Sequence, residues 1–374
     1  MLNVLLLIVI GCTCNPESLP EVLKEEVPLR LRPNLVFVTY SGLRADYLKS
    51  GGYFLDTAPH MEALASEAIV FQRAVTPLAG TAPAAASLMT GTWPYEHGVL
   101  DRQTPHMGEQ YMLAEFLSSY GYETAAFTDS NVLSDAGLDI GFQKTFQPES
   151  TKDSAVAVTD AAVAWLAARE DDQPFFLWVH YSDLRGNLDI EPPYDSLFVD
   201  DEGIAAWVRE RDIGRIEGFK KAPPLVISDY NGSIRFLDDQ FHRLVARLNL
   251  SQEWDETIVV LTSVSGRGLG QHGADTLGDL WWEQLHVPLM IKAPQQKATK
   301  VPHVVSLADV LPSVMYLVAL PGKEELLEQV SGINVFEPGF SARPVFAQMS
   351  VKAQKAGSPE GYSLTTNDWH YLFL

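Results

Sequence analysis

The stretch TIVVLTSVSGRGLGQHG, residues 257–273, decides the fold class. Its first six residues are apolar or β-branched, which predicts a buried strand over 257–262. A polar, glycine-rich loop follows directly, and loops at the carboxyl ends of strands carry the catalytic groups of most α/β enzymes. The two residues at the turn, Val264 and Ser265, are nevertheless poor metal ligands and poor acids. The sequence therefore predicts an active-site loop that lacks the side chains expected in it.

Apolar runs alternate with helical patterns on both sides of this stretch. Further buried parallel strands are predicted over 35–39, 124–128, 174–180 and 287–292. Helical periodicity covers 58–67, 84–90, 110–120, 154–169 and 229–249. This alternation predicts an α/β fold with a large parallel sheet and helices on both faces. Residues 184–228, rich in Pro, Asp and Gly, are expected to form a long surface excursion.

The two ends of the chain differ in character from this core region, which we place at 33–297. A helix over 306–318 and β-like pieces over 344–348 and 369–374 predict a small α+β subdomain over 298–374, and the end of the chain within a strand-like run suggests truncation. The N-terminal apolar run of about eight residues is too short to span a bilayer, which takes about 20, but matches a signal-peptide core.

The N-terminal run ends in Val9-Ile10-Gly11-Cys12, which resembles a bacterial lipobox. We expect a signal peptide over 1–11, lipidation of Cys12, and a tether over 12–32 that anchors the protein at the bacterial cell envelope, on the periplasmic or extracellular face. A misassigned start codon and a buried N-terminal strand are the alternatives, and no basic residue precedes the run.

Composition excludes several classes of function. A formal net charge of −21 argues against a nucleic-acid backbone or an anionic membrane surface as the main partner. Both cysteines, Cys12 and Cys14, precede residue 15, so a disulfide framework, a thiolate metal site and a Cys nucleophile are excluded from the body of the chain. There is no P-loop and no dinucleotide fingerprint. A triad of Ser263 or Ser265 with His272 lacks its G-x-S-x-G elbow.

Seven segments resemble, in order, those of the sulfatase family within the alkaline-phosphatase superfamily. The resemblance implies the large parallel-sheet sandwich of that family over 33–322, and hydrolysis of sulfate or phosphate esters with a divalent cation and an activated nucleophile. The segments are LVFVTYSGLRADYL (35–48), TAPHMEALASEAIVFQRAV (57–75), TAPAAASLMTGTWPYEHGV (81–99), FFLWVHYSDLRGNL (175–188), the 257–273 loop, LWWEQLHVPLMIKAP (280–294) and SLADVLPSVMYLVALPG (306–322).

The positions that carry the family's metal have changed. Ser41 and Gly42 stand where the family has metal-binding aspartates, and Val264 and Ser265 stand where it has Asp followed by His or Asn. These four residues offer no carboxylate, so we expect no cofactor. A Ca, Mg, Mn or Zn ion would need relocated ligands. Candidates are Asp46, Asp183 and Asp279, although Asp46 is expected to begin a helix or to pair with Arg44.

Thr81 occupies the family's nucleophile position. Sulfatases need Cys or Ser there for oxidation to formylglycine, and the arginine that guides this modification is replaced within Ala84-Ala85. Unmodified threonine serves as nucleophile in phosphodiesterase and phosphotransferase relatives, where a metal lowers its pKa. We expect Thr81 to act mainly as an N-cap before Pro83 and to be a vestigial nucleophile.

A cleft for an anionic ester or a glycan could survive these changes. The polar residues that remain at matching positions are His180, Arg185, Arg267 and His272. Arg185 replaces a family histidine, and Gly278 replaces a family Lys or His. Trp281-Trp282 is more typical of core and rim packing than of a sugar platform.

Three hypotheses follow from these residues. The favoured one is a non-catalytic, sulfatase-like envelope lipoprotein that keeps the scaffold and the cleft, because the replacements at Ser41, Val264 and Ala85 agree with one another. The second is a hydrolase or transferase of sulfate or phosphate esters that uses Thr81 with relocated metal ligands. The third is a structural subunit that pairs with an active paralogue.

Overall fold

The computed structural model describes residues 32–106, 110–149, 154–169, 173–186, 188, 190–199, 201–214, 216, 219–273, 278–318, 320–351, 354 and 360–374. The expected signal peptide, Cys12 and most of the tether lie outside these residues. An eight-stranded sheet in the order β4-β3-β5-β1-β6-β7-β2-β8 forms the centre. Its strands are β1 (Asn34–Ser41), β2 (Ile69–Val75), β3 (Glu123–Thr128), β4 (Lys144–Phe146), β5 (Phe175–Tyr181), β6 (Thr257–Ser265), β7 (His286–Lys292) and β8 (Thr299–Ser306).

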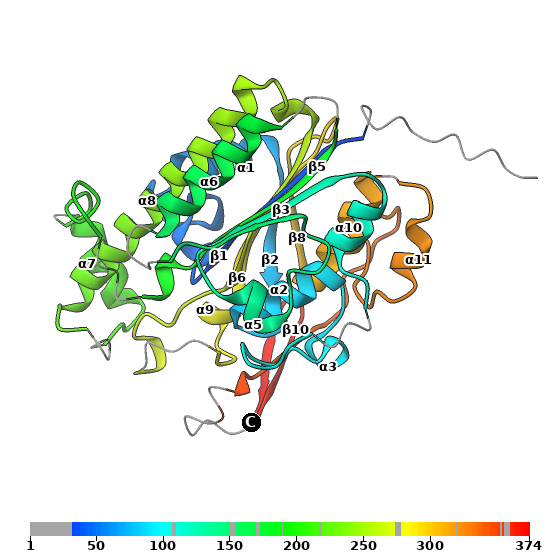
Figure 1. Ribbon diagram of the computed structural model, residues 1–374. Helices are drawn as coiled ribbons and strands as arrows, with labels where there is room; N and C mark the ends of the chain where they lie inside the picture. The colour runs from blue at the N-terminus through cyan, green and yellow to red at the C-terminus, as the bar shows by residue number, and fades with distance from the viewer. Residues whose placement is uncertain are drawn as a thin grey trace, which may run out of the picture.

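Helices cover both faces of this sheet, which confirms the expected fold class (Figure 1). One face carries α1 (Pro59–Glu67), α6 (Ser154–Ala168), α7 (Glu202–Glu210) and α8 (Pro223–Leu250). The other carries α2 (Thr81–Thr90), α4 (Leu113–Ser119), α5 (Val132–Ala136) and α10 (Val310–Val318). Shorter helices are α3 (Pro94–His97), α9 (Trp282–Leu285) and α11 (Lys323–Leu327). The predicted apolar stripe of α8 is buried at Ile234, Leu237, Phe241, Leu244 and Leu248.

One predicted strand direction was wrong. The run 287–292 was expected to be parallel, but β7 is antiparallel to both of its neighbours, β6 and β2. The described part of the connection from β6 to β7 contains only short helical turns and no long helix that crosses the sheet, so the chain reverses direction there. A buried apolar run carries no information about direction, because both of its faces are covered in either case.

The main sheet also continues beyond residue 297, the boundary expected from the sequence. Strand β8 pairs in parallel with β2, and α10 packs against α2. The small C-terminal unit is a three-stranded antiparallel sheet, β9 (Val345–Gln348), β10 (Tyr362–Thr365) and β11 (His370–Phe373). The excursion at 184–228 is only partly on the surface, because α7 buries Ile204, Trp207 and Val208 in the core. None of the described helices is long and apolar enough to cross a membrane.

Candidate functional site

The carboxyl ends of β1, β5 and β6 bring the sequence-predicted residues to one edge of the sheet. Strand β1 lies between the other two, with Thr39 opposite His180 and Ser41 opposite Ser265. Helix α2 begins at the same edge with Thr81. Because neighbouring parallel strands end together, residues that lie 139 positions apart in the sequence come into hydrogen-bond contact here.

Thr81 is the centre of this cluster. Its Oγ1 lies 2.7 Å from Ser41 Oγ and accepts a hydrogen bond from Arg185 Nη1 over 2.8 Å. Ser41 Oγ lies in turn 3.2 Å from His180 Nε2. The expected N-cap role of Thr81 was wrong, because Gly80 occupies the N-cap and Thr81 is already inside the helix. Its hydroxyl is therefore turned to the sheet edge and away from the backbone amides that a cap would bond.

The orientation of His180 is fixed from behind by Thr39 and Trp178. Trp178 Nε1 donates to Thr39 Oγ1 over 2.8 Å, and the same oxygen lies 2.8 Å from His180 Nδ1. Thr39 Oγ1 also contacts the Val179 carbonyl oxygen at 3.4 Å, so Thr39 links His180 to two neighbouring groups of the same strand. Burial, together with the charge of Arg185, lowers the pKa of His180 to about 3, so the ring is neutral at physiological pH.

Arg185 brings a positive charge to this cluster. Burial and the nearby charge of Arg102 lower its pKa, while Asp129 acts in the opposite direction. Sequence reasoning missed Asp129, which directly follows β3 and accepts a hydrogen bond from the Ser182 amide over 2.6 Å. Burial and the neighbouring carboxyl of Asp183 raise the pKa of Asp129 well above its usual value. Its position directly after β3, at the edge of the sheet where β1 and β5 also end, could have identified it from the sequence.

The residues that the resemblance places at the family's metal positions do not fit a divalent cation. The Ser41 hydroxyl is engaged with Thr81 and His180, and Val264 is fully buried in the hydrophobic core on the α2 side of the sheet. Gly42 has φ +96°, and a Cβ there would lie 3.0 Å from the Leu184 carbonyl oxygen. Ca²⁺ and Mg²⁺ need several oxygen ligands, mainly carboxylates. Asp129 and Asp183 are two carboxylates at this edge, but they belong to no group of three metal-ligating side chains within the described residues.

Gly278, the other replaced position, is closely covered. Its φ is +103°, and a side chain at this position would overlap Ser350, whose Cβ lies 2.8 Å from the position of a Cβ on Gly278. The Ser350 amide donates to the Gly278 carbonyl over 2.9 Å, which holds the two segments together. A family-type Lys or His therefore has no room here unless Ser350 moves.

The other sequence candidates have contacts of their own. Arg267 donates to the carbonyl oxygens of Leu184 and Gly186 over 2.6 and 2.9 Å, so its described contacts hold the segment that carries Arg185. His272 stacks on Trp281 with 3.8 Å between ring centroids, and its Nε2 lies 3.6 Å from Glu283. Trp281 is half-buried and packs against His272.

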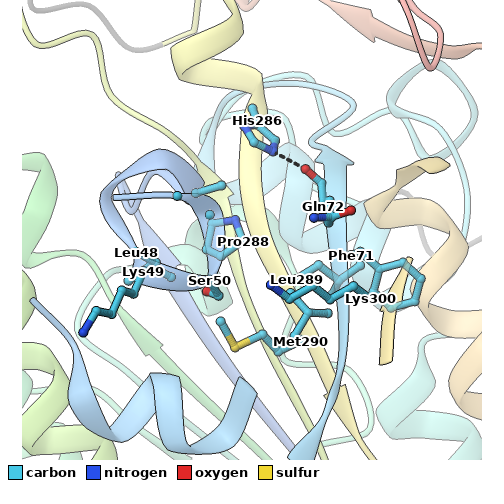
Figure 2. A pocket seen from close by; sticks show the side chains of 14 residues that line it. Leu48, Lys49, Ser50, Phe71, Gln72, His286, Pro288, Leu289, Met290 and Lys300 are labelled. Atoms are coloured by element: carbon cyan, nitrogen blue, oxygen red, sulfur yellow. Dashed lines mark hydrogen bonds between the residues drawn. The ribbon is translucent and has the colours of Figure 1, made fainter. Parts of the chain in front are cut away.

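The remaining acids and serines are occupied as well. Asp46 forms the expected ion pair with Arg44 at 2.7 Å. Asp279 is buried, and its amide donates to Gln284. The Ser263 hydroxyl donates to the Tyr40 carbonyl oxygen over 2.8 Å, which does not support a triad with His272. A separate cavity of about 320 Å³ lies between the 45–52 loop and strands β2 and β7, and none of the predicted site residues lines it (Figure 2).

Comparison with known proteins agrees with this architecture. A protein-family model described as Sulfatase matches residues 33–320. The chain belongs to the sulfatase family. Among curated proteins, this family member is 23% identical over 353 residues to an N-acetylglucosamine-6-O-sulfatase of Bacteroides thetaiotaomicron, a match that covers 71% of this chain and 63% of that protein. It is 23% identical to an arylsulfatase of Clostridium perfringens, over 76% of this chain and 74% of that protein.

Solved structures share the fold. The phosphonate monoester hydrolase of Agrobacterium radiobacter superposes with a TM-score of 0.73 at 18% identity, over 92% of this chain and 87% of that chain. This sulfatase-family chain therefore has the scaffold of ester hydrolases. The matched region spans less than two thirds of the length of the first relative named above.

Proposed function

We propose that this protein is a non-catalytic member of the sulfatase family that binds an anionic ester group at the Thr81 cluster. The observation that carries the proposal is the pairing of Ser41 with Thr81 at 2.7 Å. In the family, the first position holds a metal-binding aspartate and the second a nucleophile. Here two neutral hydroxyls are hydrogen-bonded to each other, and no carboxylate replaces the first.

The donors around Thr81 support anion binding without a metal. Arg185 supplies a half-buried guanidinium, which is the donor best suited to bidentate contact with a sulfate or phosphate group. Ser41 and Thr81 add two linked hydroxyls, and Nε2 of the neutral His180 lies 3.2 Å from Ser41 Oγ. Catalysis by Thr81 has little support, since Ser41 and Val264 offer no carboxylate for a metal, and a His180 with a pKa of about 3 is a weak base.

The test is a comparison of binding and turnover in the purified protein. We expect inorganic sulfate to bind and Arg185→Gln to weaken that binding at least tenfold, because a charged hydrogen bond contributes about 1.5–3 kcal/mol. Arg209→Gln, which removes the same charge from an exposed position on α7, should have no effect. Turnover of an aryl sulfate or a phosphodiester that requires bound metal and is abolished by Thr81→Ala would establish the hydrolase alternative instead.

Lipid anchoring at the bacterial envelope is the second part of the proposal. It rests on the lipobox-like residues that end in Cys12, and the named curated relatives are bacterial proteins. We expect a protein expressed in bacteria to incorporate a labelled fatty acid and to fractionate with membranes, and Cys12→Ser to remove both properties. Cys14→Ser is the matched control. An unlabelled, soluble wild-type protein would exclude the anchor.

A further inference from the structure

A group of metal-ligating side chains joins α1 to α8, away from the Thr81 cluster. The two helices pack side by side on one face of the main sheet (Figure 1). His60, in the first turn of α1, faces Asp238 and Asp239 of α8, and one ligand atom of each lies within 4.8 Å of the others. His60 Nε2 is 3.9 Å from Asp239 Oδ1, a separation that a single ion between the two atoms can bridge.

The imidazole is held ready to ligate. His60 stacks on His242 of α8, with 3.9 Å between ring centroids and 16° between ring planes. The His60 side chain is also 35% exposed, so an ion can reach it from solvent.

The two carboxylates are held by neighbouring groups in the manner of metal ligands. Asp238 accepts the backbone amides of His60 and Met61 over 3.0 and 2.8 Å, one on each oxygen. A carboxylate oxygen has two lone pairs, so each oxygen of Asp238 keeps one for an ion. Asp239 accepts a hydrogen bond from the Tyr194 hydroxyl over 2.6 Å on Oδ2, which leaves Oδ1 facing His60. Such outer partners fix ligand orientation in metal sites.

We propose that His60, Asp238 and Asp239 form a Zn²⁺ site that fastens the start of α1 to α8, with water in the fourth position. One imidazole and two carboxylates suit Zn²⁺, whereas Ca²⁺ takes oxygen ligands and would leave the imidazole unused. The ion would also neutralise Asp238, which is fully buried with two backbone amides as its described hydrogen-bond donors. The ion would link two packed helices, and none of the three residues belongs to the Thr81 cluster.

The experiment is a titration of the full chain with Zn²⁺, read by calorimetry and by the melting temperature. We expect one Zn²⁺ fewer to bind to His60→Gln and to Asp239→Asn than to the wild type, or its affinity to fall about tenfold or more. Both variants should melt close to the wild type without metal, because both side chains are partly exposed. Zn²⁺ should raise the melting temperature of the wild type and not of the variants.

His303→Gln is the matched control, since it removes an exposed histidine elsewhere on the surface. It should bind Zn²⁺ as the wild type does. Equal stoichiometry and affinity in the wild type, His60→Gln and Asp239→Asn would overturn the proposal. An equal gain in melting temperature from Ca²⁺ would also overturn it, because the imidazole would then contribute nothing. Any Zn²⁺ bound by Cys12 and Cys14 would remain in every variant, so it cannot account for the expected loss of one Zn²⁺ in His60→Gln and Asp239→Asn.

Discussion

The guanidinium of Arg185 donates a hydrogen bond to the hydroxyl of Thr81, with 2.8 Å between Nη1 and Oγ1. This contact brings a positive charge to the position where the sequence resemblance places the family's nucleophile. Burial lowers the pKa of Arg185, because the charged guanidinium is partly removed from water in the folded protein. We expect Arg185→Gln to leave the free energy of unfolding unchanged or raised by about 1 kcal/mol. Urea denaturation measures this free energy of unfolding. If Arg185→Gln lowered it by several kcal/mol, the role of Arg185 would be mainly structural.

Val264→Asp, which introduces the residue that the resemblance places at this position, should destabilise the fold. Val264 is fully buried among apolar side chains, and an unpaired buried carboxylate costs several kcal/mol even after its pKa rises. We expect the midpoint of chemical denaturation to fall and added Ca²⁺ or Mg²⁺ not to restore it. Val264→Ala should lose about 1–3 kcal/mol by cavity formation alone and serves as the control. A variant Val264→Asp that folds normally and binds a cation would contradict this description of the site.

Gly278→Ala should be more destabilising than Gly52→Ala. Both glycines have positive φ, +103° and +94°, so both substitutions carry backbone strain. Only Gly278 has a neighbour in the way, because a Cβ there meets Ser350, whereas the space around Gly52 is open. The difference between the melting temperatures of the two variants therefore measures the effect of the clash with Ser350. Ser350→Gly should recover part of the loss at position 278, and equal losses at both positions would show that Ser350 is not an obstacle.

The neutral state of His180 predicts how stability changes with pH. Its pKa is lowered in the folded protein to about 3 from an unfolded value of 6.5, so the unfolded state binds more protons between these values. This contribution is fully present above about pH 6.5 and is lost as the pH falls, with a slope of about 1.4 kcal/mol per pH unit. We expect His180→Gln to reduce the slope of unfolding free energy against pH in this window by that amount. His303→Gln should leave the slope unchanged, and an unaltered slope in His180→Gln would mean that the ring is protonated when folded.

The sequence was sufficient for most of the fold because the pattern of burial is local. The runs that became β1, β3, β5 and β6 are apolar on both faces, and the stripe of α8 has helical spacing. The direction of β7 could not be predicted, because it depends on the connection that precedes it. The place of β8 in the sheet could not be predicted either, since its first half is mostly exposed and therefore has no apolar run.

The sequence predicted which residues form the site but not the hydrogen bonds between them. Thr81, His180 and Arg185 were identified one at a time from their places in family-like segments, and the structure brings them together through Ser41. Their hydrogen bonds depend on which way a hydroxyl turns at the first residue of a helix. Residue type could not decide whether Thr81 would face the backbone or the sheet edge. Arg267 was identified by the same reasoning, yet its contacts with Leu184 and Gly186 depend on the path of a loop.

The packing of Val264 has a consequence for the order in which mutations could accumulate. An aspartate introduced at position 264 alone would destabilise the fold, because its carboxylate would be buried among apolar side chains. It would also bind no cation, because Ser41 and Gly42 offer no second carboxylate. A carboxylate regained first at Ser41 would break the contacts with Thr81 and His180 without gaining a metal. Each single reversal is therefore disadvantageous on its own. A metal site built on carboxylates at these positions therefore requires substitutions at both Ser41 and Val264 together.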